Sequence, residues 1–307
     1  MTSGAARLNQ RAALASVSMA IVLLVAKGYA TAATGSVAML GSLADTALDL
    51  IASLVTLWGV HIAGLRADED HRFGHGKAES LAALFQMMLI AGSAIAIAWR
   101  SILTLIRGAG AHNAETGILI SVFAGAATVA LLAYQRHVIA RTRSVAIGAD
   151  HLHYQSDLAL NCAVIVALLL DRYAGWHAAD GLFGLAIALW LGWSAFRSAT
   201  QAIDQLMDRE WPEAKRRAFL DVAATIPALA GMHDLRTRTS GALDFAQFHM
   251  AFPPETTIAT AHEVMEEIEA RLAETFPGLE VLIHPDPAGH VDAEGALPAA
   301  IAERREV

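Results

Sequence analysis

Six long apolar stretches fill the first two thirds of the chain, and they limit its fold more than any other feature. Each runs for roughly 20 residues or more, the length that an α-helix needs to cross a hydrocarbon core of about 30 Å. The mean hydropathy is +0.43 and only 17% of the 307 residues are charged, an apolar excess too large for a soluble domain of this length. We therefore predict an α-helical membrane protein with six transmembrane helices, near residues 12 to 33, 37 to 63, 79 to 106, 115 to 138, 145 to 170 and 180 to 203.

The charges between these stretches predict the orientation of the chain. Basic residues gather before the first stretch and in the second and fourth loops, whereas the opposite side has chiefly Arg107 and Arg172. By the positive-inside rule, both termini lie in the cytoplasm. The alternative that the first stretch is a secretory signal, with small residues for cleavage near Ala30, is disfavoured by the five stretches that follow it. The basic residues on the cytoplasmic side are Arg7, Arg11, Arg66, Arg72, Lys77, Arg136, Arg141 and Arg143.

From about Asp208 the sequence changes to alternating polar and apolar segments, with Trp211 and Pro212 at the boundary. This pattern predicts a cytoplasmic α+β domain of the order αββαβ, ferredoxin-like or metallochaperone-like. We expect the tail from 288 to 307, rich in Ala, Glu and Pro, to be disordered. The predicted elements are helices at 213 to 226 and 258 to 275, and strands at 233 to 240, 243 to 252 and 279 to 284.

The cysteine count and the net charge exclude several classes of site. Cys162 is the only cysteine, so the chain can form neither an internal disulfide nor a thiolate metal cluster. Any metal ion must therefore be bound by histidine and carboxylate side chains. The formal net charge of -8 argues against nucleic acid as a partner, since a nucleic-acid-binding surface is basic.

Two of the predicted membrane helices each carry a pair of polar side chains at helical spacing. Asp45 and Asp49 lie in the second stretch, and His153 and Asp157 lie in the fifth. A carboxylate near the bilayer centre costs about 2.5 to 3.5 kcal/mol on insertion scales, so such a pair requires an explanation. An i, i+4 spacing places both side chains of a pair on one helix face, one turn apart. Because the two helices run in opposite directions and both pairs lie at middle depth, the pairs can face each other.

Three carboxylates and one imidazole form a four-coordinate ligand set suited to Zn²⁺, with Fe²⁺, Cd²⁺ and Co²⁺ as competitors. A divalent cation would also remove the repulsion among the three carboxylates. The alternative interpretation is that these groups carry protons or pair helices without any metal. Asp150 lies on the same face as His153, nearer the cytoplasm, and is a candidate for attracting incoming cations. His151 points to a nearly opposite face and is more typical of a packing or loop-facing histidine.

Four sequence segments resemble the cation diffusion facilitator family, and within it the bacterial zinc and ferrous-iron efflux pumps. They are SLADTALD at 42 to 49, DHRFGHGKAE at 70 to 79, HYQSD at 153 to 157 and HDLRTR at 233 to 238, in a match over nearly all of residues 7 to 287. The resemblance implies a homodimer in the bacterial inner membrane that exchanges cytoplasmic metal for protons by alternating access. It also implies that Asp45, Asp49, His153 and Asp157 form the transport site, and that the histidine favours zinc, cadmium or iron over manganese.

The resemblance implies two further metal sites. Asp68, His71 and His75 in the second cytoplasmic loop match the family's loop site, and the two histidines would lie one turn apart if the loop were locally helical. Alone, two loop histidines are more often solvated surface residues. In the cytoplasmic domain, the resemblance implies a binuclear site near the dimer interface, formed by His233, His249, His262, His284 and Asp286.

Pro285 departs from the family pattern, because related pumps often carry a polar residue between the histidine and the aspartate. Proline supplies no side-chain hydrogen bond, which puts the support of the neighbouring ligands in doubt. Histidines with a structural role are the alternative in this domain. The resemblance also implies an ion pair between Lys77 and Asp208 that hinges the two protomers. An exposed pair would contribute only about 0 to 1 kcal/mol, so this role requires burial.

Together these features predict proton-coupled export of divalent transition metals, with Zn²⁺ also bound in the cytoplasmic domain. A membrane-anchored sensor that binds metal without moving it is the alternative, although it would not need the intramembrane residues. A membrane metalloenzyme is disfavoured, because the segment from His262 to Glu266 ends in glutamate where a HExxH zinc motif requires histidine. The predicted segments are a cytoplasmic N-terminus at 1 to 11, a transport domain at 12 to 207, a metal-binding dimerisation domain at 208 to 287 and the tail at 288 to 307.

Overall fold

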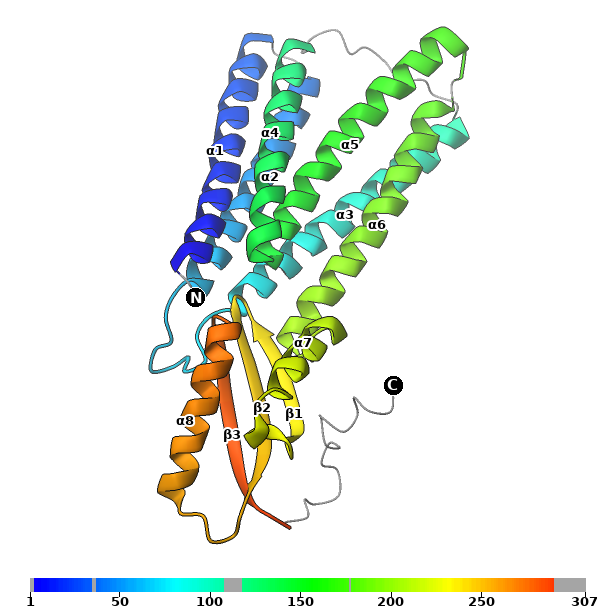
Figure 1. Cartoon of the computed structure of the whole chain (residues 1–307). Helices are drawn as coiled ribbons and strands as arrows, with labels where there is room; N and C mark the ends of the chain where they lie inside the picture. The colour runs from blue at the N-terminus through cyan, green and yellow to red at the C-terminus, as the bar shows by residue number, and fades with distance from the viewer. Residues whose placement is uncertain (1–2, 35–36, 108–117, 177, 290–307) are drawn as a thin grey trace. The chain divides into compact units, whose positions relative to one another are not determined.

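The computed structural model describes residues 3 to 34, 37 to 107, 118 to 176 and 178 to 289 (Figure 1). The chain forms two compact units, one over Ser3–Ile203 and one from Asp204 onward. The domain boundaries predicted above stay predictions. Most of the tail expected to be disordered, from residue 290, lies outside the described residues.

The first unit is built from six long helices, and each falls on one of the six apolar stretches. Four of them contain described segments that are long and apolar enough to cross a membrane, at Gly4–Tyr29, Asp45–Ala63, Ala78–Ile106 and Gly181–Leu206. For α4 and α5, some side chains lie outside the described residues. That all six helices cross the membrane therefore remains a prediction. The helices are α1 (Ser3–Thr34), α2 (Val37–Ala63), α3 (Ala78–Arg107), α4 (Ile118–Thr142), α5 (Val145–Ala174) and α6 (Ala179–Leu206).

The outer surface of this unit is strongly apolar, as expected of helices that face lipid. Large side chains such as Ile95, Trp99, Trp193 and Phe196 each expose about two thirds of their surface, between 65% and 71%. Such a density of exposed tryptophan and aliphatic side chains is rare on soluble monomers, where exposed apolar patches stay small. The surface therefore agrees with a membrane environment.

The inner surfaces of the helices carry small residues that allow close packing. α1 packs against α2 and α4, and α3 packs against α2 and α5. At Gly59 of α2, an added Cβ would lie only 2.4 Å from the Cβ of Ala82 on α3, so this crossing requires glycine. α6 joins the bundle through Leu191 and Ala195, which are buried in one cluster with Met87 and Ile90 of α3.

The second unit has the predicted order αββαβ. Its three-stranded sheet has the order β1-β2-β3, in which β1 and β2 form an antiparallel hairpin and β3 returns parallel to β2 through α8. The predicted helix at 213 to 226 ends at Ala223, and the one turn of 3₁₀ helix η1 (Pro227–Leu229) follows, because a proline cannot continue the α-helical hydrogen bonds. The elements are α7 (Glu213–Ala223), β1 (His233–Ser240), β2 (Leu243–Phe252), α8 (Ile258–Thr275) and β3 (Leu279–Pro287).

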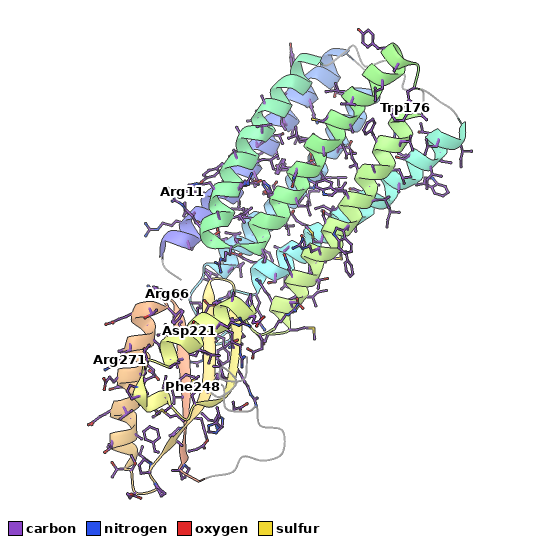
Figure 2. The ribbon with its side chains drawn as sticks, turned by 45° about the vertical axis from the view of Figure 1, so that its right-hand side comes forward. Arg11, Arg66, Trp176, Asp221, Phe248 and Arg271 are labelled. Atoms are coloured by element: carbon purple, nitrogen blue, oxygen red, sulfur yellow. The ribbon has the colours of Figure 1, made fainter. Side chains whose placement is uncertain are left out.

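One face of this sheet carries the core of the second unit. Phe219 of α7, Phe248 of β2 and Leu272 of α8 are almost fully buried in one cluster, whereas Arg271, next to Leu272 on α8, is exposed. Figure 2 labels Phe248 and Arg271. Because strand side chains alternate between faces, His249 and its odd-numbered neighbours on β2 lie on the opposite face from Phe248. The strand histidines His233, His249 and His284, which pair across the sheet, are thereby separated from the apolar core.

Candidate functional site

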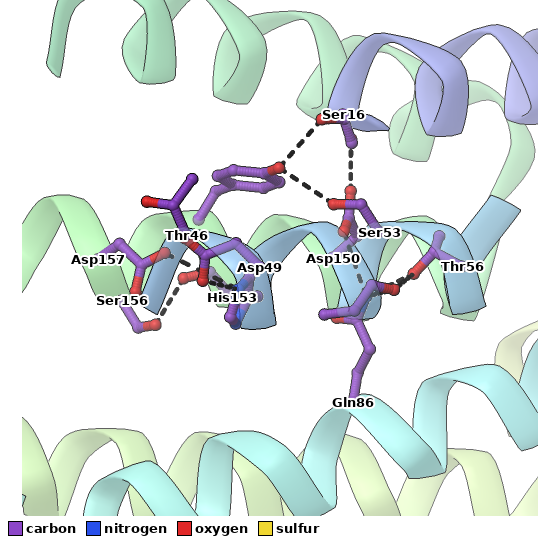
Figure 3. Close-up of polar contacts among 12 residues, drawn as sticks. Ser16, Thr46, Asp49, Ser53, Thr56, Gln86, Asp150, His153, Ser156 and Asp157 are labelled. Atoms are coloured by element: carbon purple, nitrogen blue, oxygen red, sulfur yellow. Dashed lines mark hydrogen bonds and ion pairs between the residues drawn. The ribbon is translucent and has the colours of Figure 1, made fainter. Parts of the chain in front are cut away.

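Three of the four residues in the pairs predicted from sequence meet between α2 and α5. His153 Nε2 lies 3.0 Å from Asp49 Oδ1 across the two helices, and 3.8 Å from Asp157 Oδ2 one turn further along α5 (Figure 3). One ligand atom from each of these three residues lies within 4.8 Å of the other two. The side chains are 14% to 39% exposed, so the cluster is partly buried yet reachable. Two carboxylates and an imidazole at these distances can share one cation.

Asp45, the fourth predicted ligand, is not part of this three-residue cluster. It lies one turn before Asp49 on α2 and is exposed. The i, i+4 spacing places it on the same helix face as Asp49, but spacing alone does not fix which side chains turn toward α5. Its participation as a fourth ligand stays a prediction.

An intramembrane lysine that the sequence analysis did not single out lies near the site. Lys27 Nζ on α1 donates a hydrogen bond of 2.7 Å to Thr46 Oγ1 on α2, and Thr46 is buried between the two predicted ligands of that helix. Its signal in the sequence is a lone lysine inside the first apolar stretch, which is costly unless the ammonium is solvated or paired.

Asp150 is completely buried, and each of its hydrogen bonds is donated by a neutral side chain. The suggestion that it attracts incoming cations therefore receives no support from its position. Tyr154, the residue after His153, donates to the backbone carbonyl of Ser16 at 3.1 Å and lies 3.0 Å from Ser53 Oγ. These contacts tie the middle of α5 to α1 and α2 beside the cluster.

The loop residues Asp68, His71 and His75 also converge, with ligand atoms within 4.8 Å of one another. Asp68 Oδ1 lies 3.3 Å from His71 Nδ1, and Asp68 Oδ2 lies 3.2 Å from His75 Nε2. The loop is not locally helical, so the two histidines do not lie one helical turn apart. The chain turns instead at Gly74, whose φ of +77° favours glycine, and the Gly74 N–H donates to the His71 carbonyl.

The loop carboxylate is fixed by backbone amides. The N–H of His71 donates to Asp68 Oδ1 at 2.7 Å, and the N–H of Asp70 donates to the same oxygen at 3.1 Å. The hydrogen bond from the His71 backbone is the main cause that lowers the pKa of Asp68 below its ordinary value. The side chain is therefore held as an ionised carboxylate, the form that binds a cation.

In the second unit, three strands bring a third cluster together. The register pairs His233 with His249 and His249 with His284, so residues distant in sequence become neighbours on adjacent strands. Asp286 Oδ2 lies 2.8 Å from His249 Nδ1 and 3.5 Å from His233 Nε2, and Asp286 Oδ1 lies 3.3 Å from His284 Nε2. Ligand atoms of His233, His249 and Asp286 all lie within 4.8 Å of one another.

Two residues of this unit differ from the sequence expectation. His262 on α8 is exposed and lies 3.4 Å from Glu266, and the three-residue cluster does not include it, so its role as a ligand stays a prediction. Asp234, which the sequence analysis did not assign, lies 3.6 Å from His249 Nε2 and is buried. Its φ of +49° is unusual for aspartate and turns the chain at the start of β1. No periodicity in the sequence signals such a turn.

Pro285 lies in β3 opposite Met250. β3 is an edge strand of the sheet, where a missing backbone N–H is tolerated. The neighbouring candidate ligands His284 and Asp286 still contact each other, so proline at this position does not prevent the two side chains from converging. Lys77 and Asp208 belong to different units, and the hinge ion pair between them stays a prediction. Within its own unit, Asp208 contacts Arg238 at 3.4 Å.

Comparisons with known proteins cover nearly the whole chain. Residues 13 to 207 match the family described as cation efflux transmembrane domain, and residues 211 to 288 match the cation efflux protein cytoplasmic domain. Two cation-efflux pumps named FieF, from Salmonella schwarzengrund (strain CVM19633) and Salmonella newport (strain SL254), are each 43% identical over 289 residues, covering 94% of this chain and 96% of the relative. A solved structure of CzrB, titled as a candidate zinc transporter in its zinc form, is 36% identical and covers 28% of this chain and 99% of its own, with a TM-score of 0.24.

Proposed function

Since this chain belongs to the cation diffusion facilitator family of cation-efflux proteins, we propose that it exports divalent transition metals, principally Zn²⁺, in exchange for protons. The family consists of transporters and not of enzymes. The observation that carries the proposal is the cluster of Asp49, His153 and Asp157, contributed by two helices of the transmembrane unit. The metal ion is the cargo of the protein, and its ligands must therefore both bind and release it.

The ligand types of the cluster suit a divalent metal ion of intermediate hard–soft character. Zn²⁺ binds imidazole nitrogen and carboxylate oxygen in four-coordinate geometry, and Fe²⁺, Cd²⁺ and Co²⁺ accept the same ligands. We assign Asp49, His153 and Asp157 as three ligands and Asp45 as the fourth. Rotation of the exposed Asp45 side chain would complete the set.

Coupling to protons follows from the same lone pairs. A metal ion requires carboxylate oxygens and a neutral imidazole nitrogen, so protons and metal compete for the site. Protonation of His153 and the carboxylates on the side of high proton concentration releases the metal there. Alternating access of the helices then returns the protonated site to the cytoplasm, where metal displaces the protons. We also propose that the protein lies in the bacterial inner membrane with both termini in the cytoplasm, on the basis of the basic residues in its cytoplasmic loops.

The remaining clusters support accessory roles. We assign Asp68, His71 and His75 as a metal site at the cytoplasmic loop, and His233, His249, His284, Asp286 and His262 as a site in the cytoplasmic domain. The match to a cytoplasmic dimerisation family supports a homodimer. In that dimer the second site stabilises or regulates the assembly, and Lys77 and Asp208 hinge the two protomers.

Zinc flux in sealed proteoliposomes tests this function. The wild type is expected to move zinc when a pH gradient is imposed and to stop when the gradient is collapsed. His153→Gln should lose transport, whereas His137→Gln should keep it, because His137 is an exposed residue of α4 and belongs to none of the three clusters found among the described residues. A protein that binds zinc but moves none would instead support the membrane-anchored sensor.

A further inference from the structure

Asp150 of α5 is the most deeply buried carboxyl group near the transport site, with an exposure of 0%. Figure 3 shows its side chain beside Ser16 of α1 and Gln86 of α3, from which it accepts hydrogen bonds of 2.5 Å (Ser16 Oγ) and 3.2 Å (Gln86 Nε2). It also accepts one of 2.7 Å from Gln135 Nε2 of α4, and the Ser53 hydroxyl of α2 faces it as well. Asp150 lies three residues before His153 and therefore about one turn away on the same helix. A buried carboxyl at this place is costly, and its contacts indicate how the cost is met.

The described hydrogen-bond partners of this carboxyl group on the other helices are all neutral. Within the described part of the chain, Asp150 forms no ion pair with lysine or arginine, and its neighbours from α1, α3 and α4 are a hydroxyl and two amides. The titratable groups that act on it electrostatically are His153 and Tyr154, both on α5. Two forms therefore remain possible: an anion stabilised by three neutral donors, or a neutral carboxylic acid.

The surrounding hydrogen bonds accommodate both forms. Each of the three donors has a second acceptor within reach: Ser16 Oγ has the Ala12 carbonyl at 3.2 Å, Gln135 Nε2 has Ser16 Oγ at 3.0 Å, and Gln86 Nε2 has the Ala52 carbonyl at 3.2 Å. When Asp150 gains a proton, it can donate to Ser16 Oγ, and Ser16 can turn its own hydrogen to Ala12. No buried donor is left without an acceptor in either state, which avoids the usual cost of breaking a buried hydrogen bond.

From this geometry we propose that Asp150 is a proton-binding site of the exchange cycle, separate from the carboxylates that bind metal. The inference rests on the proposed function. When a divalent ion occupies the cluster one turn away, its positive charge disfavours a proton on Asp150. The carboxyl O–H bond then breaks, the proton passes to water, and the three donors turn toward the anion. When the metal leaves, the carboxylate takes up a proton from water. Asp150 thus adds one proton to the exchange without touching the metal.

Proton release on zinc binding tests this role directly. Purified full-length protein in lightly buffered solution is titrated with zinc, and the protons released per zinc ion are counted at several pH values. Asp49→Asn is measured in parallel, and its difference from the wild type gives the number of protons released by zinc binding at the transport site. Asp150→Asn, which removes the titratable proton at nearly constant shape, should still bind zinc but release up to one proton fewer at that site. An unchanged count in Asp150→Asn would overturn the inference.

Infrared spectroscopy of the carboxyl group provides a second test that does not depend on counting the protons released on zinc binding. Infrared difference spectra of the wild type, with and without zinc, should show the loss of protonated carboxyl C=O absorption, part of which comes from Asp150 and part from the transport-site carboxylates. The Asp150 part should be missing from the Asp150→Asn difference spectrum, and identical difference spectra in the two proteins would contradict the role of Asp150. If Asp150→Asn fails to fold, Ser16→Ala keeps the carboxyl and removes its closest partner. The pH at which the extra proton is released should then shift, and an unshifted profile would contradict the inference.

These outcomes are distinguishable from a failure of the proposed function. If the wild type neither moves zinc nor releases protons when zinc binds, the exchange itself is wrong. If the wild type does both and the Asp150 and Ser16 variants behave identically to it, only the additional proton site is wrong.

Discussion

His153 and Asp49 join α5 to α2 through a contact of 3.0 Å between Nε2 and Oδ1, in the interior of the transmembrane unit. The two residues are 104 positions apart in the sequence, so only the packing of the helices brings them together. A site that depends on two helices is well suited to transport, because relative movement of the helices changes the distance between its ligands.

The imidazole of His153 should determine which metal the site prefers. Replacing His153 by Asp would give an all-oxygen site, and carboxylate ligands suit Mn²⁺ better than an imidazole does. We expect the ratio of zinc to manganese flux in proteoliposomes to fall by about 10-fold or more, because changing even a residue that only supports a metal ligand typically costs about 10- to 100-fold in affinity or activity. His137→Asp, an exposed change on α4, should leave the ratio unchanged. A wild-type ratio in His153→Asp would contradict the assignment of this ligand.

Asp286 should be the most important single ligand of the cytoplasmic cluster, because it contacts His233, His249 and His284. Asp286→Ala should weaken zinc binding at this site by about 10- to 100-fold, as measured by calorimetry on a protein with the transport and loop ligands replaced. Glu280→Gln, on an exposed position of the same strand, is the matched control. Equal affinities in the two variants would mean that metal binds elsewhere in this unit.

The crossing of α2 and α3 should tolerate no side chain at Gly59. A Cβ there would lie 2.4 Å from Ala82 Cβ and 3.1 Å from the Ala78 carbonyl oxygen, so Gly59→Ala should separate the helices and destabilise the unit by about 1 to 3 kcal/mol. Gly92→Ala on α3 meets no atom within 4 Å and should be neutral or stabilising by up to about 1 kcal/mol. Thermal unfolding in detergent compares the two. A Gly59→Ala protein as stable as Gly92→Ala would disprove the close contact.

The loop carboxylate should remain ionised at unusually low pH in the metal-free protein. The pKa of Asp68 is lowered by the His71 backbone hydrogen bond, so the stabilisation from this contact is present above the ordinary pKa of about 3.9 and is lost as the pH falls through the lowered value. An NMR titration of the Asp68 carboxyl measures this midpoint. In His71→Pro, which lacks that N–H, the titration midpoint of Asp68 should move back toward the ordinary value. Identical Asp68 midpoints in the wild type and in His71→Pro would refute the role of this hydrogen bond.

The sequence predicted those parts of the structure that depend on local periodicity. Helical spacing identified the pairs Asp45 with Asp49 and His153 with Asp157, and the order of elements in the second unit followed from alternation and turn residues. The sequence did not predict which side chains turn inward. Asp45 is exposed while Asp49 meets His153, although both lie on one face of α2. That difference depends on how α5 packs against α2, which no local pattern encodes.

Other features escaped prediction because they depend on backbone conformation or on contacts between distant helices. The loop histidines meet through a turn at Gly74 and not through a helix, and Asp234 joins the cytoplasmic cluster by means of a positive φ. The surroundings of Asp150 come from three other helices, and its neighbours Ser16, Gln86 and Gln135 are ordinary polar residues in the sequence. Nothing in their spacing along the chain marks them as partners.

The coordination of zinc in the transport site is the most direct test of the account. X-ray absorption should be measured on a protein whose loop and cytoplasmic ligands have been replaced, so that zinc can bind only between α2 and α5. We predict a four-coordinate ion with one imidazole nitrogen and three carboxylate oxygens at roughly 2.0 to 2.2 Å, and loss of the imidazole signal in His153→Gln. Failure of this protein to bind zinc, or an imidazole signal that persists in His153→Gln, would contradict the central claim.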